Sequence, residues 1–201
     1  MLRAPKTLAA VMSNSPMSKD EVVDRLFAVF TDQGYDGATL AEISRATGLG
    51  KSSLYHHFPG GKEDMALAVL ARADEWLRVN VIAAVNGPGT PRDRLMRMLD
   101  AFNTIYAGGK NACVLGKLVA GTARPLFQRQ LREIFSRWIG ALEKVAVDAG
   151  VPQRIARSRA EDAVAGIQGA LILSAGLADS EPFRRRLRAI VDDLLAKAPK
   201  R

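Results

Sequence analysis

Apolar residues recur every three or four positions along most of the chain, which is the spacing of one face of an α-helix. In the first such segment Val22, Leu26 and Phe30 fall on one side, and Gly34 follows as a helix stop. This segment predicts a helix over 18–33. The same pattern predicts helices over 39–46, 50–57, 62–85, 91–107, 112–121, 124–149, 158–178 and 182–197. Since no strand pattern persists, we expect an all-α protein with about nine helices.

Four of the predicted helices carry the same start signal, a Ser or Thr followed three residues later by an acid. The pairs are Ser18/Glu21, Thr39/Glu42, Thr90/Asp93 and Ser158/Glu161. The Ser or Thr oxygen accepts a backbone N–H that the helix start leaves unpaired, and the acid reaches back to the cap. Pro91, which follows Thr90, is favoured at a first helical position. These pairs therefore predict where four helices begin.

The two short helices predicted over 39–46 and 50–57 are joined through a tight turn at Gly48. Glycine adopts positive φ without steric cost, which a reversal of this kind requires. At about 100° per residue, Leu54 and Phe58 of the second helix point toward the core, and the opposite side of that helix is polar. This layout is typical of a helix-turn-helix.

The polar side of the second helix suits a helix that lies in the major groove of DNA. Its hydroxyls and imidazole match base edges, and Lys51 and Tyr55 match phosphates. Thr39 and Lys62 stand at the starts of neighbouring helices, where backbone N–H groups favour phosphate. The candidate DNA-binding residues are Thr39, Lys51, Ser52, Ser53, Tyr55, His56 and Lys62. The alternative is a pair of surface helices with ordinary polar exposure and no contact with DNA.

The charge balance changes this picture little. The 201 residues carry a formal net charge of +8, which favours a polyanionic partner. Seven basic and two acidic residues fall within 183–201, so most of the excess lies at the C-terminal end, which we interpret as a solvated helix face. Residues 1–17 are predicted to form a flexible arm. Arg3 and Lys6 in this arm are basic residues of the kind that contact the minor groove, although a disordered tail is the simpler interpretation.

Several classes of site are disfavoured by what the sequence contains. Cys113 is the one cysteine, which rules out an internal disulfide and a cysteine-based zinc site. His56 and His57 are adjacent and point about 100° apart on a helix, so we expect no metal and no cofactor. Motifs of nucleophile elbows, dinucleotide turns and phosphate loops are missing, so we expect no enzyme. Without a membrane-length apolar run or a clear secretory signal, we expect a cytoplasmic protein with no membrane partner.

A family resemblance rests on specific segments. The stretches 43–48 and 54–58, followed by Gly61, Lys62 and Glu63, resemble the DNA-binding domain of TetR-family transcriptional regulators. The resemblance covers about residues 18–66. The segment 112–118 further resembles the LmrA/YxaF-like subgroup of that family. One departure is that Lys51 is the single cation on the recognition face, so base specificity cannot be inferred.

The resemblance implies a homodimer that binds double-stranded DNA at a pseudopalindrome and is released by a small apolar or aromatic ligand. It implies an arm over 1–17, a DNA-binding domain over 18–62, and a ligand-binding and dimerisation domain over 63–201. In the family an apolar pocket lies within the larger domain. The candidate ligand-binding residues are Trp76, Phe102, Tyr106, Cys113, Leu118, Phe135 and Trp138. The alternative is that these side chains form ordinary core.

The last two predicted helices carry many small and apolar residues, which let helices approach closely. In the family such helices pair between protomers. The candidate dimer residues are Ala163, Gly166, Ile167, Ala170, Leu187, Val191 and Leu194. Packing within one chain would leave the same pattern.

The function predicted overall is that of a dimeric DNA-binding repressor that responds to a ligand. Two alternatives stay open at this stage: a helical small-molecule-binding protein that does not bind an operator, and a ligand-independent activator.

Overall fold

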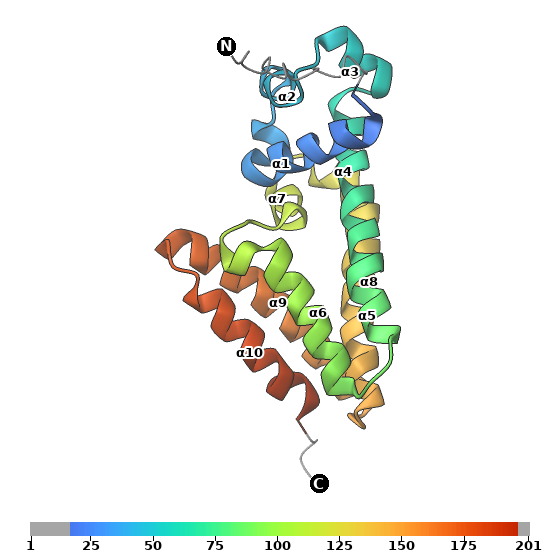
Figure 1. Cartoon of the computed structure of the whole chain (residues 1–201), viewed down its shortest axis with the longest axis vertical. Helices are drawn as coiled ribbons and strands as arrows, with labels where there is room; N and C mark the ends of the chain where they lie inside the picture. The colour runs from blue at the N-terminus through green and yellow to red at the C-terminus, as the bar shows by residue number, and fades with distance from the viewer. Residues whose placement is uncertain (1–16, 197–201) are drawn as a thin grey trace, which may run out of the picture.

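The structure, a computed structural model, describes residues 17–196 and is all-α over that range (Figure 1). Its elements are α1 (Lys19–Gly37), α2 (Leu40–Thr47), α3 (Lys51–His57), α4 (Lys62–Leu77), the π-helical η1 (Arg78–Ile82), α5 (Ala83–Asn86), α6 (Pro91–Ile105), the 3-10 turn η2 (Ala107–Gly109), α7 (Val114–Ala120), α8 (Arg124–Asp148), α9 (Gln153–Leu177) and α10 (Glu181–Leu195). Because α4, η1 and α5 are continuous, residues 17–196 form nine longer helices, and the predicted fold class is confirmed. The predicted arm, apart from Met17, and residues 197–201 lie outside the described residues.

Three of the four predicted start signals form caps. Ser18 and Glu21 make a reciprocal capping box at α1, and Thr90 and Asp93 make another at α6. Thr39 accepts the N–H of the third residue of α2. Each of these contacts satisfies backbone N–H groups that a helix start leaves unpaired.

The fourth start signal is wrong. Helix α9 begins at Gln153, so Ser158 lies inside the helix and caps nothing. The helix starts earlier because the chain leaves α8 through Gly150 at a φ of 89°, and Pro152 then stands at the N-cap. Residues from Gln153 onward continue the helix and bury Ala156 in the core.

Two helices differ in detail from their predicted courses. Helix α1 is interrupted at the predicted stop, Gly34, whose φ of 68° and ψ of −175° are non-helical, and a short turn runs on to Gly37. The segment predicted as one helix over 62–85 contains the π-helical η1. There the Asn80 side chain donates a hydrogen bond to the carbonyl of Trp76 at 2.9 Å. A π-helical segment is rare, and such segments are frequent at functional sites.

The helices form two groups along the long axis of the molecule (Figure 1). Helices α1, α2 and α3 lie at one end, and α6, α8, α9 and α10 pack at the other. Helix α4 leaves the first group and runs down beside the second, and α1 also packs on α7. No helix within 17–196 is both long enough and apolar enough to cross a membrane.

Candidate nucleic-acid interface and ligand cavity

The turn between α2 and α3 is held from both sides. Gly48 caps α2 in the left-handed conformation, with φ 73° and ψ 7°. The buried Thr47 hydroxyl donates to the carbonyl of Ile43 at 2.7 Å and accepts the N–H of Leu49 at 3.3 Å. The guanidinium of Arg25 on α1 donates to the Thr47 carbonyl at 3.0 Å. Sequence reasoning missed Thr47 and Arg25, because nothing in their spacing shows that they meet at this turn.

The polar side of α3 is exposed to solvent. Leu54 and Phe58 are buried against the core, as the pattern predicts. The exposed residues of the candidate set are Thr39, Lys51, Ser52, Ser53, Tyr55 and His56. This face is available to a partner, and its contact with DNA stays a prediction.

Tyr55 is positioned by the start of α4. Gly61 has φ 69° and ψ −138°, a conformation that other residues rarely adopt. A Cβ at Gly61 would lie 3.3 Å from the ring carbon Cε1 of Tyr55, so the ring rests on this glycine. The phenol and the first N–H groups of α4 therefore lie close together, an arrangement suited to a phosphate.

Lys62 differs from the other candidates because its ammonium is directed inward. It donates to the carbonyl of Tyr35 at 3.0 Å and lies 4.4 Å from the centre of the Tyr35 ring. A phosphate would have to compete with both interactions. On α2, Arg45 is exposed and forms an ion pair with Glu42.

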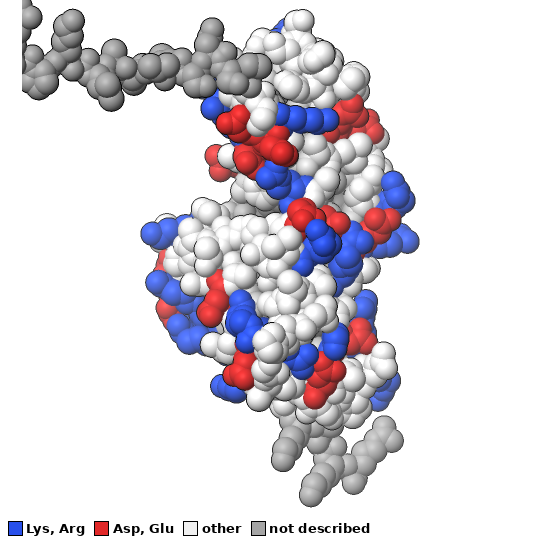
Figure 2. Space-filling view, turned by 45° about the vertical axis from the view of Figure 1, so that its right-hand side comes forward, with Lys and Arg blue, Asp and Glu red and all other residues white. Residues whose placement is uncertain are grey.

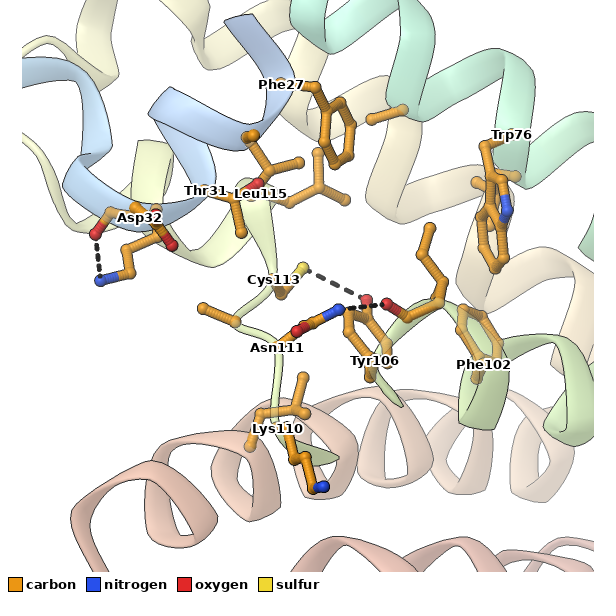
Figure 3. A pocket seen from close by; sticks show the side chains of 18 of the residues that line it. Phe27, Thr31, Asp32, Trp76, Phe102, Tyr106, Lys110, Asn111, Cys113 and Leu115 are labelled. Carbon is orange, nitrogen blue, oxygen red and sulfur yellow. Dashed lines mark hydrogen bonds between the residues drawn. The ribbon is translucent and has the colours of Figure 1, made fainter. Parts of the chain in front are cut away.

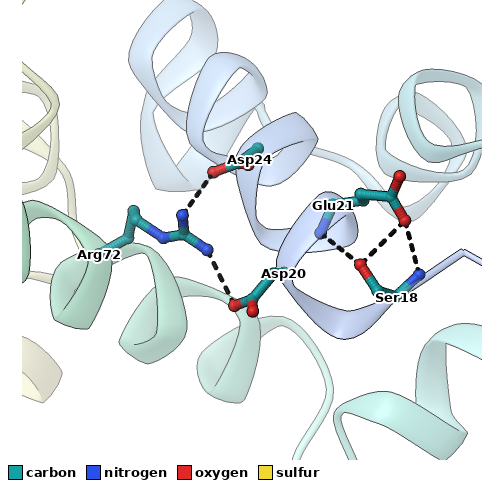
Figure 4. A network of polar contacts seen from close by, with 5 residues as sticks. All are labelled: Ser18, Asp20, Glu21, Asp24 and Arg72. Carbon is teal, nitrogen blue, oxygen red and sulfur yellow. Dashed lines mark hydrogen bonds and ion pairs between the residues drawn. The ribbon is translucent and has the colours of Figure 1, made fainter.

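Polar contacts tie α1 to the helices below it. Arg72 of α4 pairs with Asp20 and Asp24 of α1, each at 3.0 Å (Figure 4). Asp36 accepts hydrogen bonds from the hydroxyl and the N–H of Thr122, in the segment before α8. These two hydrogen bonds lower the pKa of the Asp36 carboxyl.

Elsewhere, Lys or Arg side chains alternate with Asp or Glu over the lower helices on the face seen in Figure 2, so this face does not gather one sign of charge.

A cavity of about 450 Å³ lies between α1 and the lower helices (Figure 3). It collects side chains from α1, α4, α6, α7, α8 and α9 and from the loop before α7. Five of the seven candidate ligand residues line it: Trp76, Phe102, Tyr106, Cys113 and Trp138. Leu118 is fully buried in the core instead, and Phe135 lines a separate recess on α8.

The aromatic side chains of the cavity pack around Phe102. Its ring centre lies 5.6 Å from that of Trp76, 6.1 Å from that of Tyr106 and 4.8 Å from that of Trp138. The Tyr106 hydroxyl donates to the sulfur of Cys113 at 3.4 Å (Figure 3). Burial, followed by the neighbouring Cys113, raises the pKa of Tyr106 well above its usual value, so the phenol stays neutral. This wall suits a flat apolar or aromatic molecule.

One wall of the cavity comes from α1, which sequence reasoning did not include. Phe27, Ala28 and Thr31 line this wall. The Thr31 hydroxyl oxygen and the indole nitrogen of Trp138 are buried and have no hydrogen-bond partner among residues 17–196. A buried polar group without a partner costs about 1–3 kcal/mol, so each of these two atoms lowers the stability of the packing around the cavity.

Comparisons with known proteins agree with this geometry. The family model of bacterial regulatory proteins of the tetR family matches residues 22–69, and that of the LmrA/YxaF-like transcriptional regulator C-terminal domain matches residues 91–189. The chain belongs to the TetR family of transcriptional regulators. Its second half places it with the LmrA/YxaF-like members of that family.

Individual TetR-family relatives match over nearly the whole chain. The transcriptional regulator LmrA of Bacillus subtilis is 25% identical over 185 residues, which is 90% of this chain and 97% of LmrA. A TetR regulator from Legionella pneumophila superposes with a TM-score of 0.78 at 21% identity and covers 88% of this chain and 97% of its own. FadR of Bacillus subtilis, solved with stearoyl-CoA, superposes with a TM-score of 0.71 at 14% identity and covers 90% of this chain and 100% of its own. The Legionella regulator and FadR, the two solved structures, share their fold with this chain.

The candidate dimer residues of this TetR-family chain pack against other residues of the same chain. Six of them are buried: Ala163, Ile167, Ala170, Leu187, Val191 and Leu194. Gly166, the seventh, makes room for the guanidinium of Arg186 on α10. These residues therefore serve packing within one chain, and their contact with a second protomer stays a prediction.

A different face of α9 is exposed and apolar. Ile172, Leu173 and Leu177 are 73%, 56% and 65% exposed. Gly169 and Gly176 lie beside them with no other atom within 4 Å of a Cβ built at either position. Side chains of this size are seldom left in water as a group, so this face is the candidate for a partner surface.

Proposed function

We propose that this TetR-family regulator is a homodimeric repressor that binds a pseudopalindromic operator in the cytoplasm and leaves it when a small apolar or aromatic ligand fills the cavity. The observation that carries the proposal is the exposed polar face of α3, held by a turn that is fixed through Thr47 and Gly48. Hydroxyls, an imidazole and a phenol on one short helix match the mixed donors and acceptors of a major groove.

The two groups of helices are proposed to have separate functions. Residues 18–62 bind DNA, residues 63–201 bind the ligand and dimerise, and residues 1–17 form an arm. The exposed apolar face of α9 around Ile172, Leu173 and Leu177 is proposed as the dimer contact. Two such protomers present two α3 helices, which fit successive major grooves only when they lie roughly 34–36 Å apart.

Release by ligand is proposed as a shift between two spacings of the α3 helices. The ligand favours the spacing that does not fit the operator, and it must bind the two states unequally to do so. The cavity supports this proposal because it is large, aromatic and close to α1. FadR of Bacillus subtilis, which shares this fold, was solved in complex with stearoyl-CoA, so a protein of this fold holds a small molecule.

The experiment that tests the proposal is selection of bound sequences from randomised duplex DNA with the full-length chain at physiological salt. We expect enrichment of a pseudopalindrome with half-sites about one helical turn apart. Ser52→Ala and His56→Ala should change the base preference within each half-site. Thr104→Ala, an exposed substitution on α6, is the matched control and should leave the selected sequence unchanged.

The outcomes separate the alternatives. If a folded dimer enriches no sequence, operator binding is wrong and the chain is a helical small-molecule-binding protein. If the operator is bound but no cavity ligand changes the affinity for it, release by ligand is wrong. Expression from a reporter that carries the selected operator then distinguishes a repressor from an activator.

A further inference from the structure

The turn between α2 and α3 has a sequence that does not fix its own shape. Residues 48–50 contain two glycines around Leu49, and glycine loses more conformational freedom on folding than any other residue. Gly48 stands at φ 73°, and a Cβ built at Gly50 would meet no other atom within 4 Å. The shape of this turn therefore depends on contacts that come from outside it.

Helix α3 has little packing of its own with which to resist a change in the turn. It is seven residues long, and Leu54 is its one buried residue. Ser52 and His56, which are proposed to meet base edges, lie one helical turn apart on its exposed side. Because a hydrogen bond to a base edge depends on distance and direction, a small rotation of α3 changes these contacts. The turn therefore controls how α3 meets the bases.

Arg25 on α1 makes an outside contact of this kind. Its Nη1 atom donates to the carbonyl of Thr47 at 3.0 Å and lies 3.5 Å from the carbonyl oxygen of Ala46. These carbonyls end α2, where a helix leaves its carbonyls unpaired and carries partial negative charge, so a guanidinium is a favoured partner. The Thr47 hydroxyl accepts the N–H of Leu49 at 3.3 Å, so the restraint extends into the turn.

The other end of this restraint is firm, because α1 is anchored close to Arg25. Leu26, the next residue, is fully buried in the core. Arg72 of α4 pairs with Asp20 and Asp24 of α1, each at 3.0 Å (Figure 4). The guanidinium of Arg25 therefore connects the turn to a helix that is itself held in place.

We propose that Arg25 is a positioning residue for base recognition: it holds the end of α2 from α1 and so keeps α3 in the orientation that reads the operator. This inference rests on the proposed operator binding and adds to it a residue that does not itself contact DNA. Without Arg25 the turn samples other shapes, and the affinity for the operator falls with the fraction of protomers in the competent shape. Binding to DNA of any sequence depends on charge rather than on this orientation, so it should change little.

The test compares two labelled duplexes, one with the operator selected from randomised DNA and one of equal length with scrambled half-sites. Arg25→Met should lower the ratio of the two affinities by about threefold to tenfold for each protomer, as expected for the loss of one hydrogen bond. Its affinity for the scrambled duplex, and the salt dependence of that affinity, should match wild type. Arg25→Lys keeps the charge and a donor and should recover part of the ratio.

Arg159 supplies a matched control in the other group of helices. Its Nη1 atom donates to the carbonyl of Ala196 and lies 3.4 Å from the carbonyl oxygen of Leu194, so it holds the end of α10 from α9 in the same way. Arg159→Met makes the same substitution with a similar loss of contacts and should leave the affinity ratio unchanged. Amide hydrogen exchange of the free protein gives a readout without DNA. The N–H of Leu49 should exchange faster in Arg25→Met than in wild type or in Arg159→Met.

Each contrary result has a distinct meaning. If Arg25→Met keeps the wild-type ratio or the wild-type exchange at Leu49, or if Arg159→Met loses as much of the ratio, the inference is wrong and operator binding stands. If Arg25→Met binds both duplexes more weakly and its salt slope falls by about 1.8 for a dimer, the guanidinium contacts phosphate and the inference is wrong. If wild type itself prefers neither duplex, the proposed operator binding is wrong and the inference fails with it.

Discussion

The salt dependence of operator binding provides a quantitative test of how α3 meets DNA. Lys51 is the first residue of α3, is exposed, and forms no ion pair with any residue from 17 to 196. If its ammonium neutralises a phosphate, each contact contributes about −0.9 to the slope of log K against log salt. A homodimer carries two copies, so Lys51→Gln should reduce the slope by about 1.8.

That slope corresponds to a measurable affinity change. When the salt concentration rises fourfold, from about 50 mM to 200 mM, the operator affinity of wild type should fall by a factor about twelve times larger than that of Lys51→Gln. Fluorescence anisotropy of a labelled operator duplex over this range measures both slopes. Lys144→Gln removes the same charge from α8, where the lysine pairs with Asp148, and should leave the slope unchanged.

Lys62 supplies an internal comparison within the candidate set. Its ammonium already donates to the Tyr35 carbonyl and lies over the Tyr35 ring, so Lys62→Gln should change the slope less than Lys51→Gln. A slope for Lys51→Gln equal to that of wild type would refute the orientation of α3 proposed here. A larger change for Lys62→Gln would show that its ammonium leaves Tyr35 when DNA binds.

Three further predictions concern stability and assembly. Gly61→Ala should lower the free energy of unfolding by about 1–3 kcal/mol in urea titrations, because alanine is strained at φ 69°; Gly50→Ala, at φ −70° with open space around it, should cost much less. Ile172→Glu should weaken self-association at least about tenfold in sedimentation equilibrium, since a carboxylate would be buried in the proposed contact, and an unchanged dimer would place the interface elsewhere. The pKa of Asp36 is lowered by its hydrogen bonds, so the stabilisation is present above the unfolded value of 3.8 and is lost as the pH falls through the lowered pKa. The urea midpoint of wild type should therefore fall more below about pH 4 than that of Asp36→Asn, and parallel curves would contradict this.

The parts of the fold that follow from local interactions were predictable from the sequence. Gly34 interrupts α1 and Gly48 caps α2, because both positions have a positive φ, which glycine adopts without steric cost. The caps at Ser18 and Thr90 involve residues three positions apart, so their spacing alone identifies them. The exposed side of α3 follows from helical periodicity in the same way.

The parts that depend on tertiary packing were not predictable from local patterns. Ser158 has the spacing of a cap, yet the turn at Gly150 and Pro152 sets the start of α9 earlier. Small residues such as Gly166 allow close packing without specifying whether the neighbour belongs to the same chain, and here the neighbour is Arg186. Phe135 and Trp138 lie three residues apart on α8, but they line two different hollows.

The position of the cavity matters because regulation by a ligand requires only a small coupling free energy between the cavity and the DNA-binding helices. Coupling between two sites is typically about 1–3 kcal/mol, which corresponds to a change of roughly 5–150-fold in affinity. A cavity confined to the lower helices would have to transmit this energy through α4 and the π-helical η1. Because Phe27 and Thr31 line the cavity, a ligand can act on α1 itself.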